Sequence, residues 1–216
     1  MADVLPGVVI INNFGYHMNQ VMACASWMVI IGLLMMIIGM LHINSRFARW
    51  DTRIFNFIYV RLSRFTTLFQ YLRPLGTVPV LFLLILIMYI PSCEFGIIAT
   101  ISYSISAIIE RIIKMTIRRP RPFQLLHGVK MGQLPEPHDP SHPSGDSFRV
   151  WFLACLLPFA FSLPAPIYVF SFIVAIILSL GRIALGVHFP LDVISGTGLG
   201  FLSSSIAVIS FQIITN

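Results

Sequence analysis

The segment PIYVFSFIVAIILSLGRIALGV, residues 166–187, contains a single charged residue, Arg182. A helix of about 20 predominantly apolar residues crosses the hydrocarbon core of a bilayer. The segment is therefore expected to be a membrane-spanning helix. Five further apolar segments have similar lengths and few charges: residues 21–41, 74–90, 95–113, 144–163 and 190–214. Together the six segments predict an all-α, polytopic membrane bundle with six transmembrane helices.

The composition supports this class. Hydrophobic residues make up 57% of the 216 positions and charged residues 10%, which is typical of polytopic membrane proteins. We expect one membrane-embedded domain over residues 1–216, with a motif-bearing core of about 74–214. The net charge is +6. Basic residues beside membrane spans set topology and contact anionic head groups, and no nucleic-acid-binding module accompanies them, so no nucleic-acid partner is expected.

Residues 44–73 combine arginines with aromatic and aliphatic residues. The arginines recur at intervals of mostly three to four positions, which places them on one face of a helix. They are Arg46, Arg49, Arg53, Arg61 and Arg64. A helix with one basic face and one apolar face is expected to lie in the membrane interface. It could anchor the topology or collect lipid head groups.

Residues 115–143 form the one long polar loop of the sequence. Six prolines restrict its backbone and exclude an ordinary helix there. They are Pro120, Pro122, Pro135, Pro137, Pro140 and Pro143. Because a long loop in a compact domain is usually functional or disordered, and prolines favour order, we expect an active-site loop.

Tracing the chain through six spans places residues 44–73, residues 114–143 and the turn around His188 on the same side of the membrane. The arginines outside the motifs are also on that side. The positive-inside rule then places this face in the cytoplasm. The compact chain suits a multi-pass protein of a bacterial inner membrane.

Three polar motifs stand at the ends of the apolar segments. They provide three cations, a turn of small residues and a histidine followed by a carboxylate, which are the groups needed to bind a phosphate and attack its phosphorus. The motifs are Lys114 with Arg121-Pro122, Pro143-Ser144-Gly145-Asp146, and Arg182 with His188 and Asp192. Since hydrocarbon-length helices separate them, the expected substrate is a phosphate carried on a lipid.

In this order and spacing the motifs resemble those of the type-2 phosphatidic acid phosphatase superfamily. That group of integral lipid-phosphate phosphatases shares its site with vanadium-dependent haloperoxidases and soluble acid phosphatases. The resemblance covers residues 114–192, and a six-helix core would match most of the chain. Three motifs in order at helix ends are far more specific than any one of them.

The resemblance implies that His188 is the nucleophile that receives the phosphoryl group, and that Asp192 holds its other ring nitrogen. The spacing agrees, because Pro190 suits the first turn of a helix and the i, i+4 separation brings a carboxylate beside an imidazole. A carboxylate partner fixes the tautomer and stabilises the imidazolium. The alternative is that His188 only caps the helix, with Asp192 at its positive end.

Lys114, Arg121 and Arg182 would bind the phosphoryl oxygens, doing the work that a metal does in other enzymes. No metal and no cofactor are therefore expected. Ser144 and Gly145 resemble the family turn that presents N–H groups and a hydroxyl to phosphate, although Ser144 could equally be a helix N-cap. Both roles are compatible.

Asp146 departs from the family pattern, which commonly has at this place a histidine that protonates the leaving group. An aspartate can do so only if its pKa is raised, and Arg149 on the same helical face would favour the ionised form. Three explanations stay open. Asp146 is a tuned acid, His142 or His138 replaces it, or the substrate has a leaving group that needs no proton, for which a pyrophosphate or other good leaving group would fit.

The predicted function is hydrolysis of a phosphate monoester or diphosphate on a membrane lipid, through a phosphohistidine at His188. The alternatives are a phosphotransferase that passes the group to a second lipid, and a non-catalytic lipid-phosphate binder or permease, which Asp146 favours. The expected partners are the lipid substrate and membrane lipids, with no obligatory protein partner. Phosphatidate, phosphatidylglycerol phosphate, polyprenyl diphosphate and lipid A phosphate all fit the motifs.

Overall fold

The computed structural model describes residues 6–215, and the side chains from residue 20 onward. Within that range every regular element is a helix. The long helices are α1 (Pro6–Gly39), α2 (Ser45–Leu62), α5 (Cys93–Ile117), α7 (Gly145–Ala160), α8 (Ala165–Ala184) and α9 (Pro190–Thr215). The shorter ones are η1 (Met40–Ile43), η2 (Ser63–Phe65), α3 (Thr66–Leu72), η3 (Arg73–Gly76), α4 (Val78–Ile87) and α6 (Pro122–Leu125).

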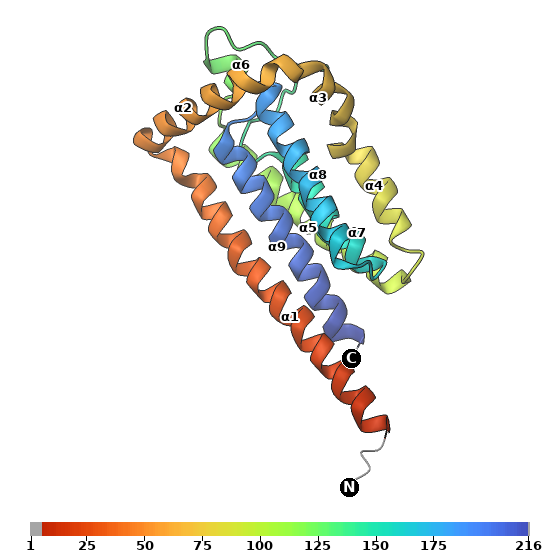
Figure 1. Cartoon of the computed structure of the whole chain (residues 1–216). Helices are drawn as coiled ribbons and strands as arrows, with labels where there is room; N and C mark the ends of the chain where they lie inside the picture. The colour runs from red at the N-terminus through yellow and green to blue at the C-terminus, as the bar shows by residue number, and fades with distance from the viewer. Residues whose placement is uncertain (1–5, 216) are drawn as a thin grey trace.

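The helices form an elongated bundle with one polar end. Helices α1, α5, α7, α8 and α9 run along the bundle, and α2 lies across the end that also carries α6 (Figure 1). The segment 44–73, the loop after α5 and the turn around His188 all meet at this end, as the sequence predicted. The tight turns before α5 and before α8 lie at the opposite end (Figure 1).

The number of membrane spans differs from the prediction. By length and composition, four described helices can cross a membrane, Gln20–Ile43, Cys93–Leu125, Ala165–Ala184 and Pro190–Thr215. The pair Ser45–Gly76 and Val78–Met88, bent by 46°, gives a fifth if it is counted as one span. The predicted segments 74–90 and 144–163 correspond to α4 with 10 residues and α7 with 16 residues, which are short for a full crossing. The count of six is therefore not confirmed.

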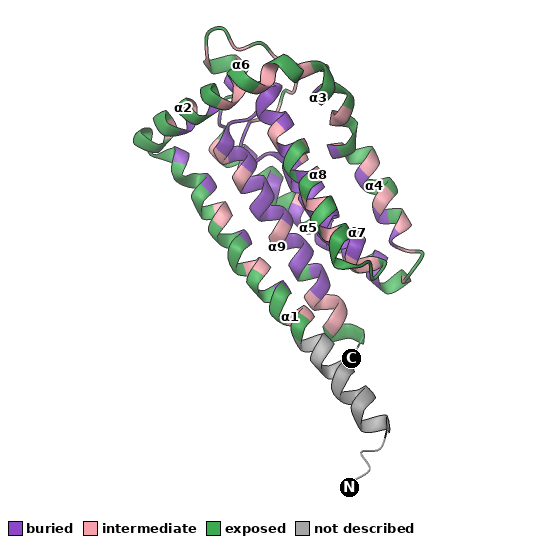
Figure 2. Cartoon of the chain, in the orientation of Figure 1, coloured by how far each residue is buried: buried purple, intermediate pink, exposed green. Residues whose placement is uncertain are grey.

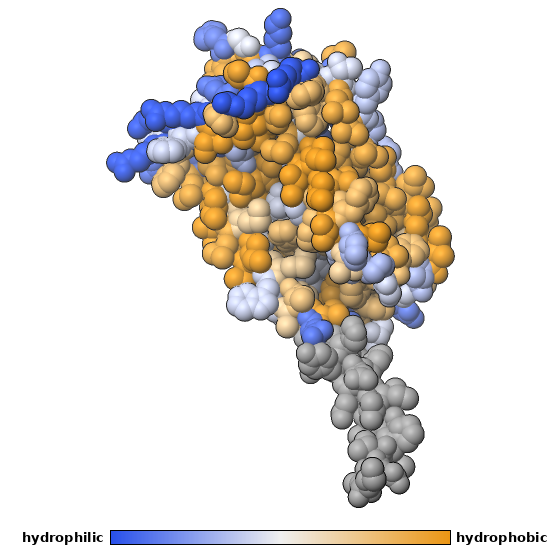
Figure 3. Space-filling model, viewed as in Figure 1, coloured by the Kyte–Doolittle hydropathy of each residue, from blue (hydrophilic) through white to orange (hydrophobic). Residues whose placement is uncertain are grey.

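The outer surface is apolar along the bundle and polar at one end. Figure 3 shows hydrophobic side chains along the flank and hydrophilic ones gathered over the α2 end. Large apolar side chains such as Ile108 of α5 and Phe170 of α8 are more than 60% exposed. In a soluble protein such exposure would be costly, whereas lipid tails cover it in a membrane. The molecule is an integral membrane protein.

Helix α2 has one buried face, while its arginines are exposed together with large apolar side chains such as Trp50. Asp51 and Phe55 are buried, while Arg46, Arg49 and Arg53 are exposed. The Asn44 side chain accepts a hydrogen bond from the Arg46 N–H at 2.9 Å and so caps the helix at its start.

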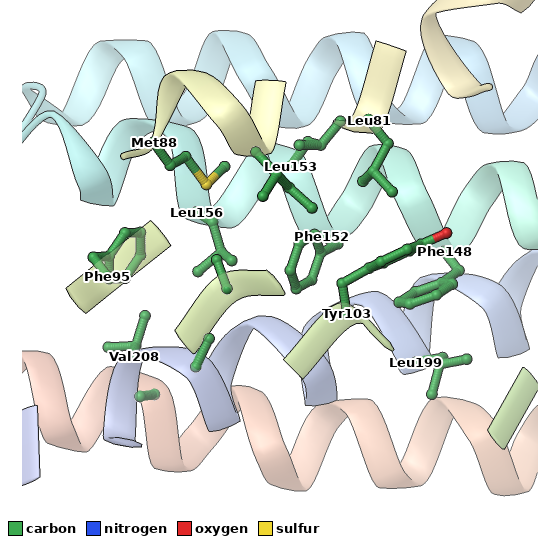
Figure 4. Packing of buried hydrophobic residues seen from close by; sticks show 14 residues of the cluster. Leu81, Met88, Phe95, Tyr103, Phe148, Phe152, Leu153, Leu156, Leu199 and Val208 are labelled. Atoms are coloured by element: carbon green, nitrogen blue, oxygen red, sulfur yellow. The ribbon is translucent and has the colours of Figure 1, made fainter. Parts of the chain in front are cut away.

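The bundle core lies along α9, α7 and α5 (Figure 2). Aromatic rings fill it, and Tyr103 stacks on Phe148 with ring centroids 5.5 Å apart (Figure 4). Small residues allow α1 to lie directly against α9. A Cβ atom on Gly198 would come within 2.6 Å of the Gly32 carbonyl oxygen. The glycines of α9 therefore serve close helix packing.

Candidate active site

The polar motifs meet where α5, α8 and α9 reach the α2 end of the bundle. Helix α5 ends at Arg118, whose left-handed backbone (φ 49°) redirects the chain into the proline-rich loop. Lys114 lies in the last turn of α5, and Arg121 comes directly before α6. His188 lies in the turn between α8 and α9, where Pro190 begins the next helix.

Lys114 and Arg121, which we call the cationic clamp, hold one carboxylate between them. The Lys114 ammonium forms an ion pair with Asp139, and Arg121 Nη2 lies 2.8 Å from Asp139 Oδ1. Arg121 Nε also donates to the Asp139 carbonyl oxygen at 2.9 Å. Lys114 Nζ also lies 2.9 Å from Oε1 of Glu110, one turn earlier on α5. The two clamp residues are thus brought together around an anion.

His188 lies beside the clamp and is buried. Its Nε2 atom is 3.2 Å from Arg121 Nη1, and its Nδ1 atom is 2.8 Å from the Ser141 carbonyl oxygen. Because a carbonyl only accepts hydrogen bonds, the ring proton belongs on Nδ1, which leaves the lone pair of Nε2 toward Arg121. Burial, and after it the charge of Arg121, lowers the pKa of His188 to about 3. The imidazole is therefore neutral, as a nucleophile requires.

Asp192 is placed differently from the expectation. Its Oδ2 atom is 3.9 Å from His188 Nδ1, too far for a hydrogen bond. The same oxygen accepts from the Ser141 hydroxyl at 2.5 Å and from the Phe189 N–H at 2.9 Å. Asp192 thus fixes Ser141, and the Ser141 carbonyl fixes the ring of His188. The predicted direct contact is replaced by one that runs through Ser141, because the loop inserts this residue between them.

Arg119 contacts the other carboxylate oxygen of Asp192. Its Nη1 atom is 2.7 Å from Asp192 Oδ1, and its Nη2 atom is 2.6 Å from Asp51 Oδ2. Asp51 Oδ1 also accepts from the Leu191 N–H at 3.0 Å. Arg119 is 9% exposed and Asp51 is 2% exposed. The interfacial helix α2 is therefore connected to the start of α9 by a buried chain of ion pairs.

Arg182 and Asp146 form a neighbouring group. Arg182 Nη1 approaches Asp146 Oδ2 to 2.9 Å without the alignment of a hydrogen bond, and Arg182 Nη2 donates to Gln133 Oε1 at 2.7 Å. Asp146 also pairs with Arg149, as the sequence predicted. Two guanidinium groups on one carboxylate favour its ionised form. The charge of Arg182 acts on His188 as well and contributes to lowering its pKa.

The small-residue turn is arranged as a helix start. The Ser144 side chain accepts from the Ser147 N–H at 3.4 Å, so it caps α7, and the Ser144 N–H donates to the Asp192 carbonyl at 3.0 Å. At Gly145 a Cβ atom would collide with the carboxylate of Glu110, so a side chain there would displace the acid that pairs with Lys114. The predicted contact of Ser144 and Gly145 with phosphate stays a prediction.

Neither alternative histidine lies against the clamp in the described part of the chain. His142 is fully buried, with Nδ1 3.2 Å from Asp192 Oδ1 and its ring 4.4 Å from that of His42. His138 is exposed and makes no hydrogen bond or ion pair with the residues that the structure describes. His142 therefore contacts the carboxylate next to His188, and neither histidine forms a hydrogen bond with His188 among the described residues.

Sequence reasoning missed the residues that hold the site together, Asp139, Ser141, Asp51 and Gln133. None belongs to a recognisable motif. The one available signal was position, since Asp139 and Ser141 lie in the proline-rich loop just before the Pro143 turn. Asp51 could have been suspected as the one acid among the arginines of α2.

A comparison with models of protein families identifies the family of this chain. The family model described as PAP2 superfamily matches residues 95–215, more than half of the chain. The chain belongs to the PAP2 superfamily. This is the type-2 phosphatidic acid phosphatase superfamily that the three motifs resemble. The matched part begins within α5 and ends in α9, so it includes every motif residue of the PAP2 site, whereas α2 and Asp51 lie outside it.

Two curated relatives each match half of the chain or slightly more. An undecaprenyl-diphosphatase of Sulfolobus acidocaldarius is 33% identical over 120 residues, 56% of this chain and 55% of the relative. Phosphatidylglycerophosphatase B of Bacillus subtilis is 28% identical over 117 residues, 50% of this chain and 53% of the relative. The chain thus spans about half the length of the curated relatives it matches.

Solved structures have the same fold. The PAP2 type phosphatidylglycerolphosphate phosphatase from Bacillus subtilis aligns with a TM-score of 0.70 at 22% identity, covering 88% of this chain and 97% of its own. LpxE of Aquifex aeolicus aligns with a TM-score of 0.63 at 29% identity, covering 73% and 94%. The all-helical PAP2 membrane fold is therefore shared along most of the chain.

Proposed function

We propose that this protein hydrolyses a phosphate on a membrane lipid, with His188 as the nucleophile. One observation carries the proposal: Lys114 and Arg121 already hold an anionic group, and Nε2 of a neutral His188 lies 3.2 Å from the same guanidinium. The site lies at the polar end of an apolar bundle, where a lipid head group would meet it (Figure 3). The PAP2 membership and the names of the relatives support the same activity.

The proposed reaction has two steps. Nε2 of His188 attacks the terminal phosphorus, a bond from nitrogen to phosphorus forms, and the bond from phosphorus to the lipid-side oxygen breaks. Water then attacks the phosphohistidine, which releases inorganic phosphate and restores the neutral ring. Arg121, Lys114 and Arg182 would stabilise the negative charge on the phosphoryl oxygens as each bond breaks.

The state of Asp146 favours one substrate class. A carboxylate paired with Arg149 and Arg182 has no proton to give to a leaving alkoxide. A lipid diphosphate needs none, because the leaving group is the lipid monophosphate, which is stable as an anion. We therefore propose a lipid diphosphate, rather than a phosphate monoester, as the preferred substrate. The same pairing favours, as a second candidate, a non-catalytic binder of lipid phosphates.

Phosphate release by the purified full chain tests the proposal. A polyprenyl diphosphate, its monophosphate and phosphatidate serve as substrates, and we expect the diphosphate to turn over fastest. His188→Ala should lower turnover by about 1,000-fold or more, because the nucleophile is lost. The matched control is His127→Ala, which changes an exposed loop histidine and should leave turnover unchanged.

Added vanadate should block release, and chelators should not. Undiminished turnover by His188→Ala would reject the nucleophile assignment. Saturable binding of the diphosphate without turnover of any substrate would identify the protein as a non-catalytic binder of lipid phosphates. Transfer of the labelled phosphoryl group to an added acceptor lipid, rather than to water, would identify a phosphotransferase.

We also propose that the α2 end of the bundle faces the cytoplasm. The support is the one-sided distribution of exposed arginines, which the positive-inside rule relates to orientation.

A further inference from the structure

The cationic clamp is occupied by a carboxylate of the protein itself. Asp139 bridges Lys114 and Arg121 through its two carboxylate oxygens, at the position beside His188 that the proposed function gives to the substrate phosphate. The side chain is 32% exposed, so this position can be reached from outside. Asp139 belongs to none of the three motifs.

Hydrogen bonds hold the proline-rich loop in place before and after residues 135–138. On the near side, the Gly132 carbonyl accepts from Gln70 at 2.7 Å, and the Leu134 carbonyl accepts from Arg73. On the far side, the Ser141 N–H donates to the Arg119 carbonyl at 2.8 Å. Within the described structure, residues 135–138 make no hydrogen bond or ion pair.

The contacts of Asp139 are therefore almost entirely those it makes with the clamp. An incoming phosphate could make the same contacts with Lys114 and Arg121. The exchange of carboxylate for phosphate then leaves the anchored parts of the loop in place.

Asp139 is ionised at every physiological pH. Burial alone would favour its neutral form, but the ammonium of Lys114 and the guanidinium of Arg121 hold the pKa of Asp139 well below its usual range. The tethered group is thus a permanent monoanion. Its local concentration, set by a short loop, is of millimolar order or higher.

A site at a membrane surface is surrounded by phosphodiester head groups. Each phosphodiester also carries one negative charge, so it gains no more Coulomb energy from the clamp than Asp139 does. A terminal phosphate carries about −1.5 to −2 charges at neutral pH. A terminal phosphate therefore gains more Coulomb energy from the two clamp cations than the Asp139 carboxylate does. A phosphodiester gains no more than Asp139 does.

We propose that Asp139 is a specificity-determining residue, a tethered carboxylate that a terminal phosphate displaces from Lys114 and Arg121 and that phosphodiester lipids do not. The proposal rests on the proposed function of the same site. Asp139 keeps the clamp free of the abundant membrane phospholipids and admits lipids that end in a phosphate.

Asp139→Asn tests the proposal in the purified full chain. The asparagine keeps the size of the side chain and removes its charge. We expect KM for the lipid diphosphate to fall about tenfold, with kcat within about twofold of the parent, because the tethered competitor is lost. Phosphatidylglycerol, mixed into the micelles, should become a competitive inhibitor of the variant while leaving the parent unaffected.

Glu136→Gln is the matched control, since it removes one negative charge from the same loop. Glu136 is exposed and pairs with no cation among the described residues, so its variant should keep the parent KM and the parent resistance to phosphatidylglycerol. An unchanged or raised KM in Asp139→Asn, or no inhibition by phosphatidylglycerol, would overturn the proposal. A large fall in kcat would also overturn it, by giving Asp139 a part in the chemistry.

A second measurement keeps Asp139 in place, so it tests the proposal even if Asp139→Asn does not fold. In a chain whose native cysteines are replaced, the distance between spin labels at His138→Cys and at the exposed Tyr71→Cys should change when vanadate binds, because the loop leaves the clamp. An unchanged distance with vanadate bound would contradict displacement. If no substrate turns over but vanadate binding tightens in Asp139→Asn, the proposed hydrolysis fails while the role of Asp139 stands.

Discussion

At the residue scale, the environment of His188 determines its chemistry. The ring is 3% exposed, one nitrogen is held by the Ser141 carbonyl, and the other faces the Arg121 guanidinium. Two nearby cations and burial all disfavour a further proton. The ring therefore meets the substrate with the lone pair of Nε2 available. In the proposed reaction, the positive charge on a phosphorylated ring would lie near the Asp192 carboxylate, which is 3.9 Å from Nδ1.

A consequence for the pH dependence follows from this environment. The pKa of His188 is lowered from 6.5 to about 3, so the neutral nucleophile persists as the pH falls through 6.5 and is lost only near pH 3. We expect no acid limb near pH 6.5 in the profile of kcat/KM, which reports ionisations of the free enzyme and free substrate. The profile should be recorded with two substrates whose terminal phosphates differ in pKa.

Any acid limb should then move with the substrate. A limb that stays near pH 6.5 with both substrates would show that His188, or another histidine of ordinary pKa, titrates in the free enzyme. That result would contradict the neutral state deduced from burial and Arg121.

At the scale of elements, α2 is more than a surface anchor. Asp51 on its buried face pairs with Arg119 and accepts a hydrogen bond from the first turn of α9. Arg119 in turn holds Asp192, which positions Ser141 beside His188. The orientation of helix α2 is thus coupled to the position of the His188 ring. Arg49 and Arg53, on either side of Asp51 in sequence, are exposed.

Asp51→Asn should weaken this coupling. The asparagine can still accept from the Leu191 N–H, so the change removes mainly the ion pair with Arg119. Leaving a buried cation without one partner should lower the free energy of unfolding by about 3 kcal/mol. We also expect kcat to fall more than KM rises, because Asp192 is positioned less firmly. Thermal unfolding in detergent and steady-state kinetics measure the two effects.

Glu94→Gln provides the control for Asp51→Asn. It makes the same change of charge at an exposed position at the opposite end of the bundle, and both quantities should stay at the parent values. Equal stability of the two variants would show that the ion pair of Asp51 and Arg119 contributes nothing.

At the scale of the whole molecule, the bundle has two unlike ends. The end with α2 carries the exposed arginines, the proline-rich loop and the motif residues, while the end with the turn before α5 carries Glu94 and Cys93 (Figure 1). An apolar flank separates the two ends (Figure 3). Orientation in the membrane therefore decides from which side the proposed lipid phosphate would reach the site.

Cysteine labelling in cells measures that orientation. In a chain whose native cysteines are replaced, Lys130→Cys should react with a membrane-impermeant maleimide in broken cells and not in intact ones. A chain that keeps only Cys93, which is exposed at the opposite end, should react in intact cells as well as in broken ones. Labelling of Lys130→Cys in intact cells, with Cys93 protected, would place the active site outside the cytoplasm.

The sequence by itself determined the fold class, the family and the end of the bundle that bears the motifs. These properties depend on hydrophobic length and on residue spacing, which are local and can be counted along the chain. The pairs Glu110 with Lys114 and Asp146 with Arg149 could also be predicted, because residues three or four apart share a helix face.

Only the tertiary structure decided which side chains contact the motif residues from distant parts of the sequence. The Asp139 carboxylate in the clamp, the Ser141 contact with His188 and the link from Asp51 to Asp192 join residues separated by 18 to 140 positions. No periodicity encodes such contacts. They depend on how α2 and the proline-rich loop pack over the ends of α5, α8 and α9, where burial forces each charge to find a partner.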